Sequence, residues 1–147
     1  MIFRWINLPP VWLFAFMGLA WWIAQFYAPL GDGLLWVGRA LIGASLLLII
    51  WAALAFHRAR TTIIPHLEPN ALVETGPYRY SRNPIYVADL AILAGWCISL
   101  GNPFALGLLF PFYAVLLGFF IRPEEERLKT HLGQHYVDYC ARVRRWI

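Results

Sequence analysis

Four long apolar runs constrain the fold of this chain more than any other feature of its sequence. Each contains at most one strongly polar side chain; the runs are 11–28 with Gln25, 34–56 with Arg39, 85–100 with Asp89, and 104–121 with none. A helix rises about 1.5 Å per residue, so an 18-residue helix spans about 27 Å, close to the hydrocarbon thickness of a bilayer. Because a backbone in lipid must satisfy its own hydrogen bonds, all four runs are predicted to be membrane helices.

The composition supports a membrane protein rather than a soluble domain. Of the 147 residues, 61% are hydrophobic and only 14% are charged, and the mean hydropathy is +0.58. A soluble domain of this size leaves too much surface exposed to hide so many apolar side chains. The first run follows Arg4 but is too long for a signal peptide, and no small-x-small cleavage pattern precedes Pro29.

The predicted fold class is an all-α integral membrane protein with about four transmembrane helices in two hairpins and a C-terminal amphipathic cytoplasmic helix. The length predicts a single domain over residues 1–147. Within it, residues 1–56 form an N-terminal hairpin. Residues 57–147 supply a cytoplasmic loop, the second hairpin and the tail, which together form the functional site. Gly38 and Gly43 are candidates for close contact between helices.

The basic residues indicate how the helices are oriented. Eleven of the twelve lie before the first run, in the loop 57–84 or after the fourth run; they are Arg4, Arg58, Arg60, Arg79, Arg82, Arg122, Arg127, Lys129, Arg142, Arg144 and Arg145. The connections 29–33 and 101–103 carry no Lys or Arg. The positive-inside rule then places both termini and the loop 57–84 in the cytoplasm, with Arg39 as an anchor at the outer interface.

Asp89 is the one charge in the third run and lies one helical turn inside its cytoplasmic end. An acid is costly at such a depth, so Asp89 is expected to pair with a cytoplasmic arginine. Two roles are consistent with its position: in one, Asp89 forms a structural ion pair, and in the other, it belongs to the functional site.

The tail after the fourth run has the pattern of an amphipathic helix. Pro123 suits a first helical position, and the acids that follow it suit a first turn. Apolar residues then recur at helical spacing, at Leu128, Leu132, Tyr139 and Val143. This pattern predicts a helix that lies on the inner membrane surface, with Trp146 as its interfacial anchor.

Two polar clusters lie at the cytoplasmic ends of the second hairpin. The first is the stretch GPYRYSRNPIY at 76–86, and the second is Glu124–Glu125–Glu126. Arginine and tyrosine donate to a carboxylate, glutamate accepts from an ammonium or a ribose hydroxyl, and tyrosine rings stabilise a cation. The alternative interpretation is that these polar side chains only cap the helix ends at the membrane interface and bind no ligand. If the hairpin brings the clusters together, they suit a zwitterionic, cationic small molecule beside lipid.

Longer motifs surround both clusters. The first motif is LVETGPYRYSRNPIY, and one apolar hairpin later the chain follows the patterns EExxL and GxxYxxYxxxVxRW. In their order and separation these motifs closely resemble the isoprenylcysteine carboxyl methyltransferase family, in its bacterial branch, to which the phospholipid methyltransferases are related. The resemblance covers residues 56–147.

The resemblance implies an integral-membrane enzyme that uses S-adenosylmethionine. Its site would face the cytoplasm, and in a bacterium the enzyme would lie in the inner membrane. Carried over by position, it implies catalytic roles for Arg82, Tyr86 and Glu125. The residues implied to bind the cofactor are Arg82, Asn83, Pro84, Tyr86, Glu124, Glu125, Tyr136 and Tyr139. Arg82 and Tyr86 are assigned to the cofactor and the acceptor, and Glu125 to the cofactor's amino group or ribose. Arg142 falls in the same C-terminal element.

The family's substrates are lipophilic and enter from the membrane. Its eukaryotic members carry histidine where this chain has Asn83, and asparagine cannot act as a base near neutral pH. The hypothesis is in-line transfer of the sulfonium methyl group to a nucleophile on an amphiphile, with the protein contributing position and electrostatics. Isoprenyl-cysteine analogues, phosphatidylethanolamine, fatty acids and quinone-like compounds are all candidate acceptors.

Two other functions are consistent with the same residues. One is a membrane reductase that uses NADPH, because sterol-reductase-like proteins resemble this family in their C-terminal regions. The other is a non-catalytic membrane protein that binds lipid. A nucleic-acid partner is not expected, because the basic residues follow the membrane topology, and the chain has neither a Rossmann glycine fingerprint nor a P-loop.

No metal site is expected. His131 and His135 are four apart on the predicted tail helix but lack an obvious third ligand. Cys97 and Cys140 lie in different segments and suggest neither a disulfide framework nor a metal-binding pair.

Overall fold

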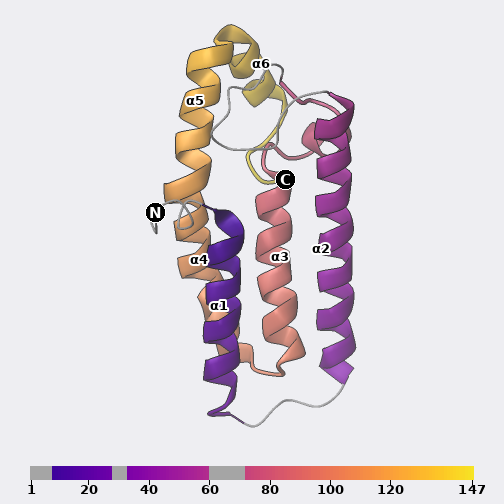
Figure 1. Ribbon diagram of the computed structural model, residues 1–147, viewed down its shortest axis with the longest axis vertical. Helices are drawn as coiled ribbons and strands as arrows, with labels where there is room; N and C mark the ends of the chain where they lie inside the picture. Colours follow the sequence, from indigo (N-terminus) through magenta and orange to yellow (C-terminus); the bar gives the residue numbers. More distant parts are fainter. Residues whose placement is uncertain (1–7, 28–32, 60–71) are drawn as a thin grey trace.

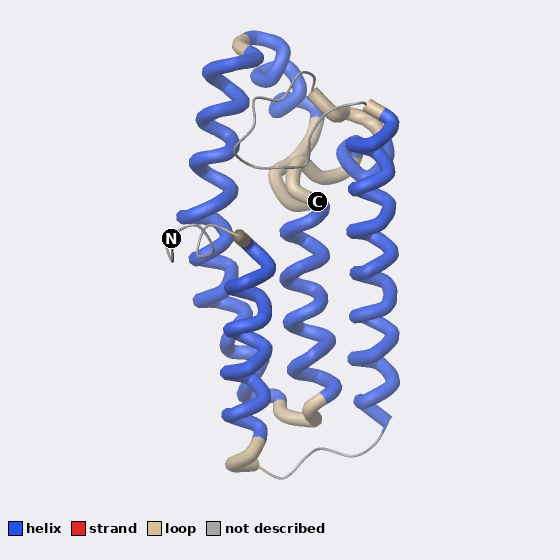
Figure 2. The backbone as a smooth tube through the Cα atoms, in the orientation of Figure 1, coloured by secondary structure: helices blue, strands red, loops and turns tan. Residues whose placement is uncertain are grey.

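The computed structural model describes residues 8–27, 33–59 and 72–147. Helices dominate this part of the chain, and it contains no strand (Figure 2). Figure 1 shows the helices of the bundle side by side; they are α1 (Pro9–Ala24), α2 (Gly33–Arg58), α3 (Pro84–Ser99) and the helical segment that contains α4 (Leu109–Val115). The all-helical class predicted from the sequence is therefore confirmed for the described residues.

Several expectations lie outside the described residues. They concern Arg4, Pro29 and Arg60, the connection 29–33 apart from Gly33, and the loop 57–84 between residues 60 and 71.

The fourth apolar run and the start of the tail form one continuous helical segment, Phe104–Leu132. Its parts are η3 (Pro103–Leu108), α4, a π-helical stretch η4 (Leu116–Ile121) and α5 (Arg122–Leu132). The structure has an α-helix from Arg122 with Pro123 and the two acids in its first turn, as predicted, but this helix continues α4 and η4 without a break and is not a separate tail helix. In a regular α-helix the proline ring would clash with the carbonyl of Phe119. The wider π-helical turn, in which the Arg122 N–H bonds to the Leu117 carbonyl, lets the helix continue through the proline.

The tail then reverses direction at Gly133. This residue has a φ of 54°, a backbone conformation that glycine adopts without strain. The next helix, α6 (Gln134–Arg142), folds back toward the end of the bundle at which α2 finishes and α3 begins (Figure 1). We call this end the site end. The single tail helix predicted from the sequence is thus two helices.

The apolar stripe of the tail packs internally. Tyr136, Tyr139 and Val143 are buried and form a small core; around it pack Leu72, Leu128, Leu132 and Cys140. The prediction that this stripe lies against the membrane surface is therefore wrong, because the reversal at Gly133 pairs the apolar faces of α5 and α6. Trp146 lies beyond α6, and its ring packs at a tilt of 33° against that of Tyr113 in α4, with 5.1 Å between centroids.

Two glycines allow α2 and α3 to pack closely. A Cβ on Gly38 would collide with the Gly95 carbonyl oxygen and would lie 2.6 Å from the Ser99 nitrogen. A Cβ on Gly95 would lie 2.7 Å from the Gly38 carbonyl oxygen. The predicted role of Gly38 is therefore confirmed, whereas a Cβ on Gly43 would meet nothing within 4 Å, so the prediction for Gly43 is wrong. Small residues of this kind let helix backbones approach each other in membrane proteins.

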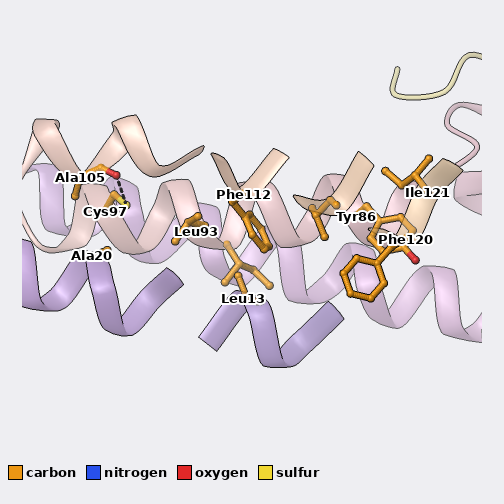
Figure 3. Close-up of a cluster of buried hydrophobic side chains, with 11 residues drawn as sticks. Leu13, Ala20, Tyr86, Leu93, Cys97, Ala105, Phe112, Phe120 and Ile121 are labelled. Carbon is orange, nitrogen blue, oxygen red and sulfur yellow. Dashed lines mark hydrogen bonds between the residues drawn. The ribbon is translucent and has the colours of Figure 1, made fainter. Parts of the chain in front are cut away.

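The main hydrophobic core lies between α1, α3 and the Phe104–Leu132 segment (Figure 3). Phe112 is fully buried there, next to Leu13 of α1. Cys97, near the end of α3, donates from its thiol to the Ala105 carbonyl at 3.3 Å and ties the two helices of the second hairpin together. The core extends to Tyr86, so the packing that joins these helices also fixes one side of the site.

Two helical segments, Gly33–Arg58 and Phe104–Leu132, are long and apolar enough to cross a membrane. The helices α1 and α3 are apolar but have 16 residues each. Large apolar side chains cover the outside of the bundle; examples are Phe14, Trp21, Trp36, Leu47 and Phe110, each at least half exposed. These features support association with a membrane, because a soluble protein of this size rarely exposes so many large apolar side chains.

Candidate functional site

The first polar motif is held against the end of α2. Its short helix η2 (Gly76–Arg79) begins at a glycine with a φ of 63°, and a Cβ at this position would lie 3.3 Å from both Ala55 and Trp51. Tyr78 is buried, and its ring meets Phe56 edge-on with 5.2 Å between centroids. Docking on α2 therefore fixes the backbone that leads into Arg82.

The C-terminal residues run along the same motif. The Arg82 N–H donates to the Arg144 carbonyl at 2.9 Å. The Asn83 side-chain amide donates to the Arg145 carbonyl at 3.1 Å, and the Ser81 hydroxyl donates to the same carbonyl at 3.4 Å. Asn83 thus holds the backbone of the tail in this structure. Pro84 is fully buried at the first position of α3, where its missing N–H costs nothing.

Arg82, Glu125 and Arg145 form the charged centre of the site. Arg145 binds Glu125 in a forked pair, with Nη2 2.7 Å from Oε2 and Nε 3.0 Å from Oε1. Arg82 Nη1 lies 3.4 Å from Glu125 Oε1. The side chains of Arg82 and Glu125 are 15% and 13% exposed, so this pair is largely screened from solvent. The forked hydrogen bond to Glu125 raises the pKa of Arg145 above its ordinary value.

The charged centre carries more positive than negative charge. Two guanidinium groups face one carboxylate, and Arg82 Nε is buried with no hydrogen-bond partner among the residues that the structure describes. A buried donor without a partner is costly, and an additional acceptor would remove that cost. Arg82 Nη1 also donates to the Cys140 sulfur at 2.6 Å, which orients the guanidinium from the α6 side.

Tyr86 and Glu124 form a second contact between the two polar clusters. The Tyr86 hydroxyl donates to Glu124 Oε2 at 3.0 Å, from α3 to α5. Tyr86 is 7% exposed, and its ring lies 6.5 Å from that of Phe120 (Figure 3). Within the described residues, the other Glu124 oxygen has no hydrogen bond. The second hairpin thus brings the arginine-rich motif and the glutamates together at the site end.

Tyr136 and Tyr139 close the site from the α6 side. The Tyr139 hydroxyl donates to the Tyr78 carbonyl at 2.7 Å and joins the tail to the first motif. Burial raises the pKa of Tyr139, and the charge of Glu74 raises it further. Burial likewise raises the pKa of Tyr136, with contributions from Cys140 and Glu125. Both hydroxyls therefore stay protonated and act as hydrogen-bond donors at neutral pH.

We expect Tyr139→Phe to lower the free energy of unfolding by about 1 kcal/mol, because it removes one buried hydrogen bond and leaves the Tyr78 carbonyl without its donor. Thermal unfolding in detergent measures the change. Tyr80→Phe is the matched control, since Tyr80 belongs to the same motif but is 65% exposed. Equal unfolding temperatures for the two variants would contradict the role given to the Tyr139 hydroxyl.

Three other polar residues lie at the rim of the site. Glu74 accepts from Arg142 Nη2 at 2.8 Å and lies 3.0 Å from His135 Nε2. Arg142, which the C-terminal motif includes, is thus part of an exposed ion-pair cluster. His131 and His135 are not on one helix as predicted, because Gly133 separates them. In the described ranges, no group of three or more potential metal ligands gathers.

Sequence reasoning missed several residues of this arrangement. Arg145, Cys140 and Ser81 all contact site residues but were not singled out as candidates. The available signal was motif membership, because Ser81 lies in the first motif and Arg145 in the C-terminal motif. The arginine partner expected for Asp89 is not found within the described part of the chain.

The chain is similar to a known protein family and to a protein of another organism. The model of a family described as phospholipid methyltransferase matches residues 34–135, more than half of the chain. This range includes Arg82, Tyr86 and the paired glutamates. A protein of Haemophilus influenzae that is described as uncharacterized is 39% identical over 64 residues, which are 43% of this chain and 100% of the relative.

Proposed function

The chain belongs to the phospholipid methyltransferase family, and on that basis we propose that it transfers a methyl group from S-adenosylmethionine to a lipophilic acceptor. The family supports a membrane methyltransferase in general, and the apolar helices agree with it. The proposed reaction resembles that of the isoprenylcysteine carboxyl methyltransferases in where its two substrates come from, not in the chemical group that accepts the methyl. It uses a charged, water-soluble donor and an acceptor from the bilayer.

The observation that supports this proposal is the meeting of two guanidinium groups with Glu125 beside the Tyr86–Glu124 pair. S-adenosylmethionine carries a carboxylate, an ammonium group, ribose hydroxyls and a sulfonium. The excess positive charge of Arg82 and Arg145 suits the carboxylate. The free oxygen of Glu124 suits the ammonium or a ribose hydroxyl. The donor and acceptor chemistry of the site therefore matches that of the ligand.

Each residue has a distinct task in this proposal. Arg82 and Arg145 bind the ligand's carboxylate, and Glu125 fixes the direction of both guanidinium groups. Glu124 binds the ammonium, and Tyr86 holds Glu124 in place. Bound S-adenosylmethionine would supply the methyl group, which is activated by its attachment to a positively charged sulfur. The chain's own contribution is position and a fixed electrostatic environment.

Other residues act through the backbone and the rings. Asn83 and Pro84 shape the entry into α3, and Asn83 holds the tail over the site. The rings of Tyr136 and Tyr139 lie at the α6 side, with centroids 6.2 Å apart, where their faces favour a cation. The tail therefore belongs to the site, and we treat residues 57–147 as one functional unit with the hairpin 1–56 packed beside it.

The proposed topology has four membrane spans. The short helices α1 and α3 cross with little tilt or with local thinning of the bilayer. The basic side chains of the site end then face the cytoplasm, and Arg39, near the start of α2, lies at the opposite face. In a bacterial cell this places the protein in the inner membrane, with the acceptor reaching the site from the lipid side.

Calorimetry in detergent tests this function with three ligands. We expect S-adenosylmethionine and its demethylated product S-adenosylhomocysteine to bind, and NADPH not to bind. Binding of NADPH alone would replace the proposal with a reductase, and binding of none of the three would leave a non-catalytic protein. A second assay incubates the protein with methyl-labelled S-adenosylmethionine and a total lipid extract; a labelled lipid would identify the acceptor.

A further inference from the structure

Asp89 is a buried acid that the site described above does not use. It is 4% exposed and lies on α3, three residues after Tyr86. This spacing places the two side chains on the same face of the helix, with Asp89 about 4.5 Å further from the site end along the axis. Among residues 8–27, 33–59 and 72–147, none forms a hydrogen bond or an ion pair with Asp89.

The surroundings of Asp89 on α3 are apolar. Ala88 and Leu93 are fully buried, and Ile92 is 6% exposed. A carboxylate in such surroundings is expensive unless it is paired, and acids within membrane segments characteristically face an interior path or bind a partner. A bound group that carries positive charge or donates a hydrogen bond would remove this cost. The position of Asp89 places that group between the polar site and the apolar core.

We propose that Asp89 determines which acceptor the protein methylates. This inference rests on the proposed function. The donor occupies the arginine and glutamate side of the site, so an acceptor that arrives from the apolar side meets Asp89 as it approaches Tyr86. The carboxylate binds a nucleophile that carries a proton, an amine or a hydroxyl, and repels an acceptor that is itself a carboxylate.

The chemistry of the transfer is consistent with this role. Asp89 takes a proton from the ammonium form of the amine, or from the hydroxyl, and the lone pair freed on the nitrogen or oxygen forms the new bond to the methyl carbon. The bond between that carbon and the sulfur breaks, and its electron pair remains on the sulfur, which becomes a neutral thioether. A carboxylate acceptor has no proton to give up, and its negative charge is repelled by that of Asp89.

The test compares three acceptors with the same twelve-carbon chain: dodecylamine, dodecanol and dodecanoate. Transfer of label from S-adenosylmethionine is measured for the unsubstituted protein, Asp89→Asn and Asp138→Asn. We expect the unsubstituted protein to methylate the amine or the alcohol and to leave dodecanoate unmethylated. Asp89→Asn should lower kcat/KM on the preferred acceptor by about 100-fold, a typical loss for a removed proton acceptor. Asp138→Asn should change nothing, because Asp138 is an exposed residue of α6.

A binding measurement without the methyl donor provides an independent readout. Quenching of tryptophan fluorescence reports the affinity for dodecylamine and dodecanoate. We expect Asp89→Asn to weaken dodecylamine binding by about tenfold or more, because one charge-assisted contact is lost, and not to weaken dodecanoate binding. Thermal unfolding of both variants shows that the fold is retained, since asparagine has nearly the same shape as aspartate.

The outcomes separate the inference from the proposed function. If the unsubstituted protein binds S-adenosylmethionine but methylates dodecanoate best, the selection by Asp89 is refuted and the methyltransferase function stands. Unchanged turnover and unchanged dodecylamine affinity in Asp89→Asn would refute the inference in the same way. If the unsubstituted protein binds neither S-adenosylmethionine nor its product, the proposed function fails and the inference fails with it.

Discussion

Glu125→Gln is expected to weaken the binding of S-adenosylmethionine by about 10- to 100-fold. The carboxylate of Glu125 accepts a forked pair from Arg145 and lies 3.4 Å from Arg82. Glutamine keeps the shape but has one acceptor oxygen and no charge, so it cannot hold both guanidinium groups. Hydrogen bonds to charged groups contribute about 1.5–3 kcal/mol each, and the loss of one such contact corresponds to this range of affinity.

Two variants make this measurement specific. Glu126→Gln is the matched control, because Glu126 is the next residue on the same helix but its side chain is exposed. It should bind S-adenosylmethionine as the unsubstituted protein does. Glu125→Asp, which restores the charge on a shorter side chain, should recover part of the affinity. Calorimetry in detergent gives the dissociation constants of the three variants and of the unsubstituted protein; equal affinity for Glu125→Gln and Glu126→Gln would refute the role given to the charged centre.

Gly38→Ala is expected to lower the free energy of unfolding by about 1–3 kcal/mol, although alanine normally stabilises a helix relative to glycine. The added methyl group would collide with the Gly95 carbonyl and lie 2.6 Å from the Ser99 nitrogen. These are backbone atoms, which cannot turn aside as the end of a side chain can. The helices α2 and α3 must therefore move apart, and the motif that docks on α2 moves with them.

Gly43→Ala is the matched control for this prediction. Gly43 lies on the same helix, but an added Cβ there meets nothing within 4 Å. Only the helix propensity changes at this position, so we expect stabilisation by about 0.5–1 kcal/mol. Thermal unfolding in one detergent measures both variants. The two substitutions are thus predicted to have opposite signs, and a stabilised Gly38→Ala would contradict the close packing of α2 on α3.

The helices were predictable because their signal is local. Apolar runs of sufficient length specify helices in a membrane, and prolines and glycines mark many of their limits. The tail was less predictable. Pro123 has the appearance of a helix start, and only the π-helical turn before it allows the helix to pass through. Gly133 follows one apolar residue and precedes a polar pair, and its sequence context does not distinguish a reversal from a helix interior.

The candidate site was predictable to a similar extent. The two polar clusters, which contain Arg82 and Glu125, were identified from their density and from a family resemblance. The residues that bind Arg82 and Glu125 were not identified from the sequence. Arg142, Arg144 and Arg145 are three basic residues within four positions, and the sequence does not separate their roles. In the structure, Arg145 binds Glu125, Arg142 binds Glu74, and Arg144 contributes its backbone carbonyl.

By itself the sequence determined the helical class of this protein, the apolar character of its long segments and the two polar motifs, because hydropathy and residue type are properties of consecutive residues. Only the tertiary structure decided which charges meet. The hairpin α3–α4 and the reversal at Gly133 bring Arg82, Glu125 and Arg145 together from three parts of the chain. Such contacts depend on how each helix is rotated about its axis and on the direction of the turn at Gly133. A change in either would bring different residues together.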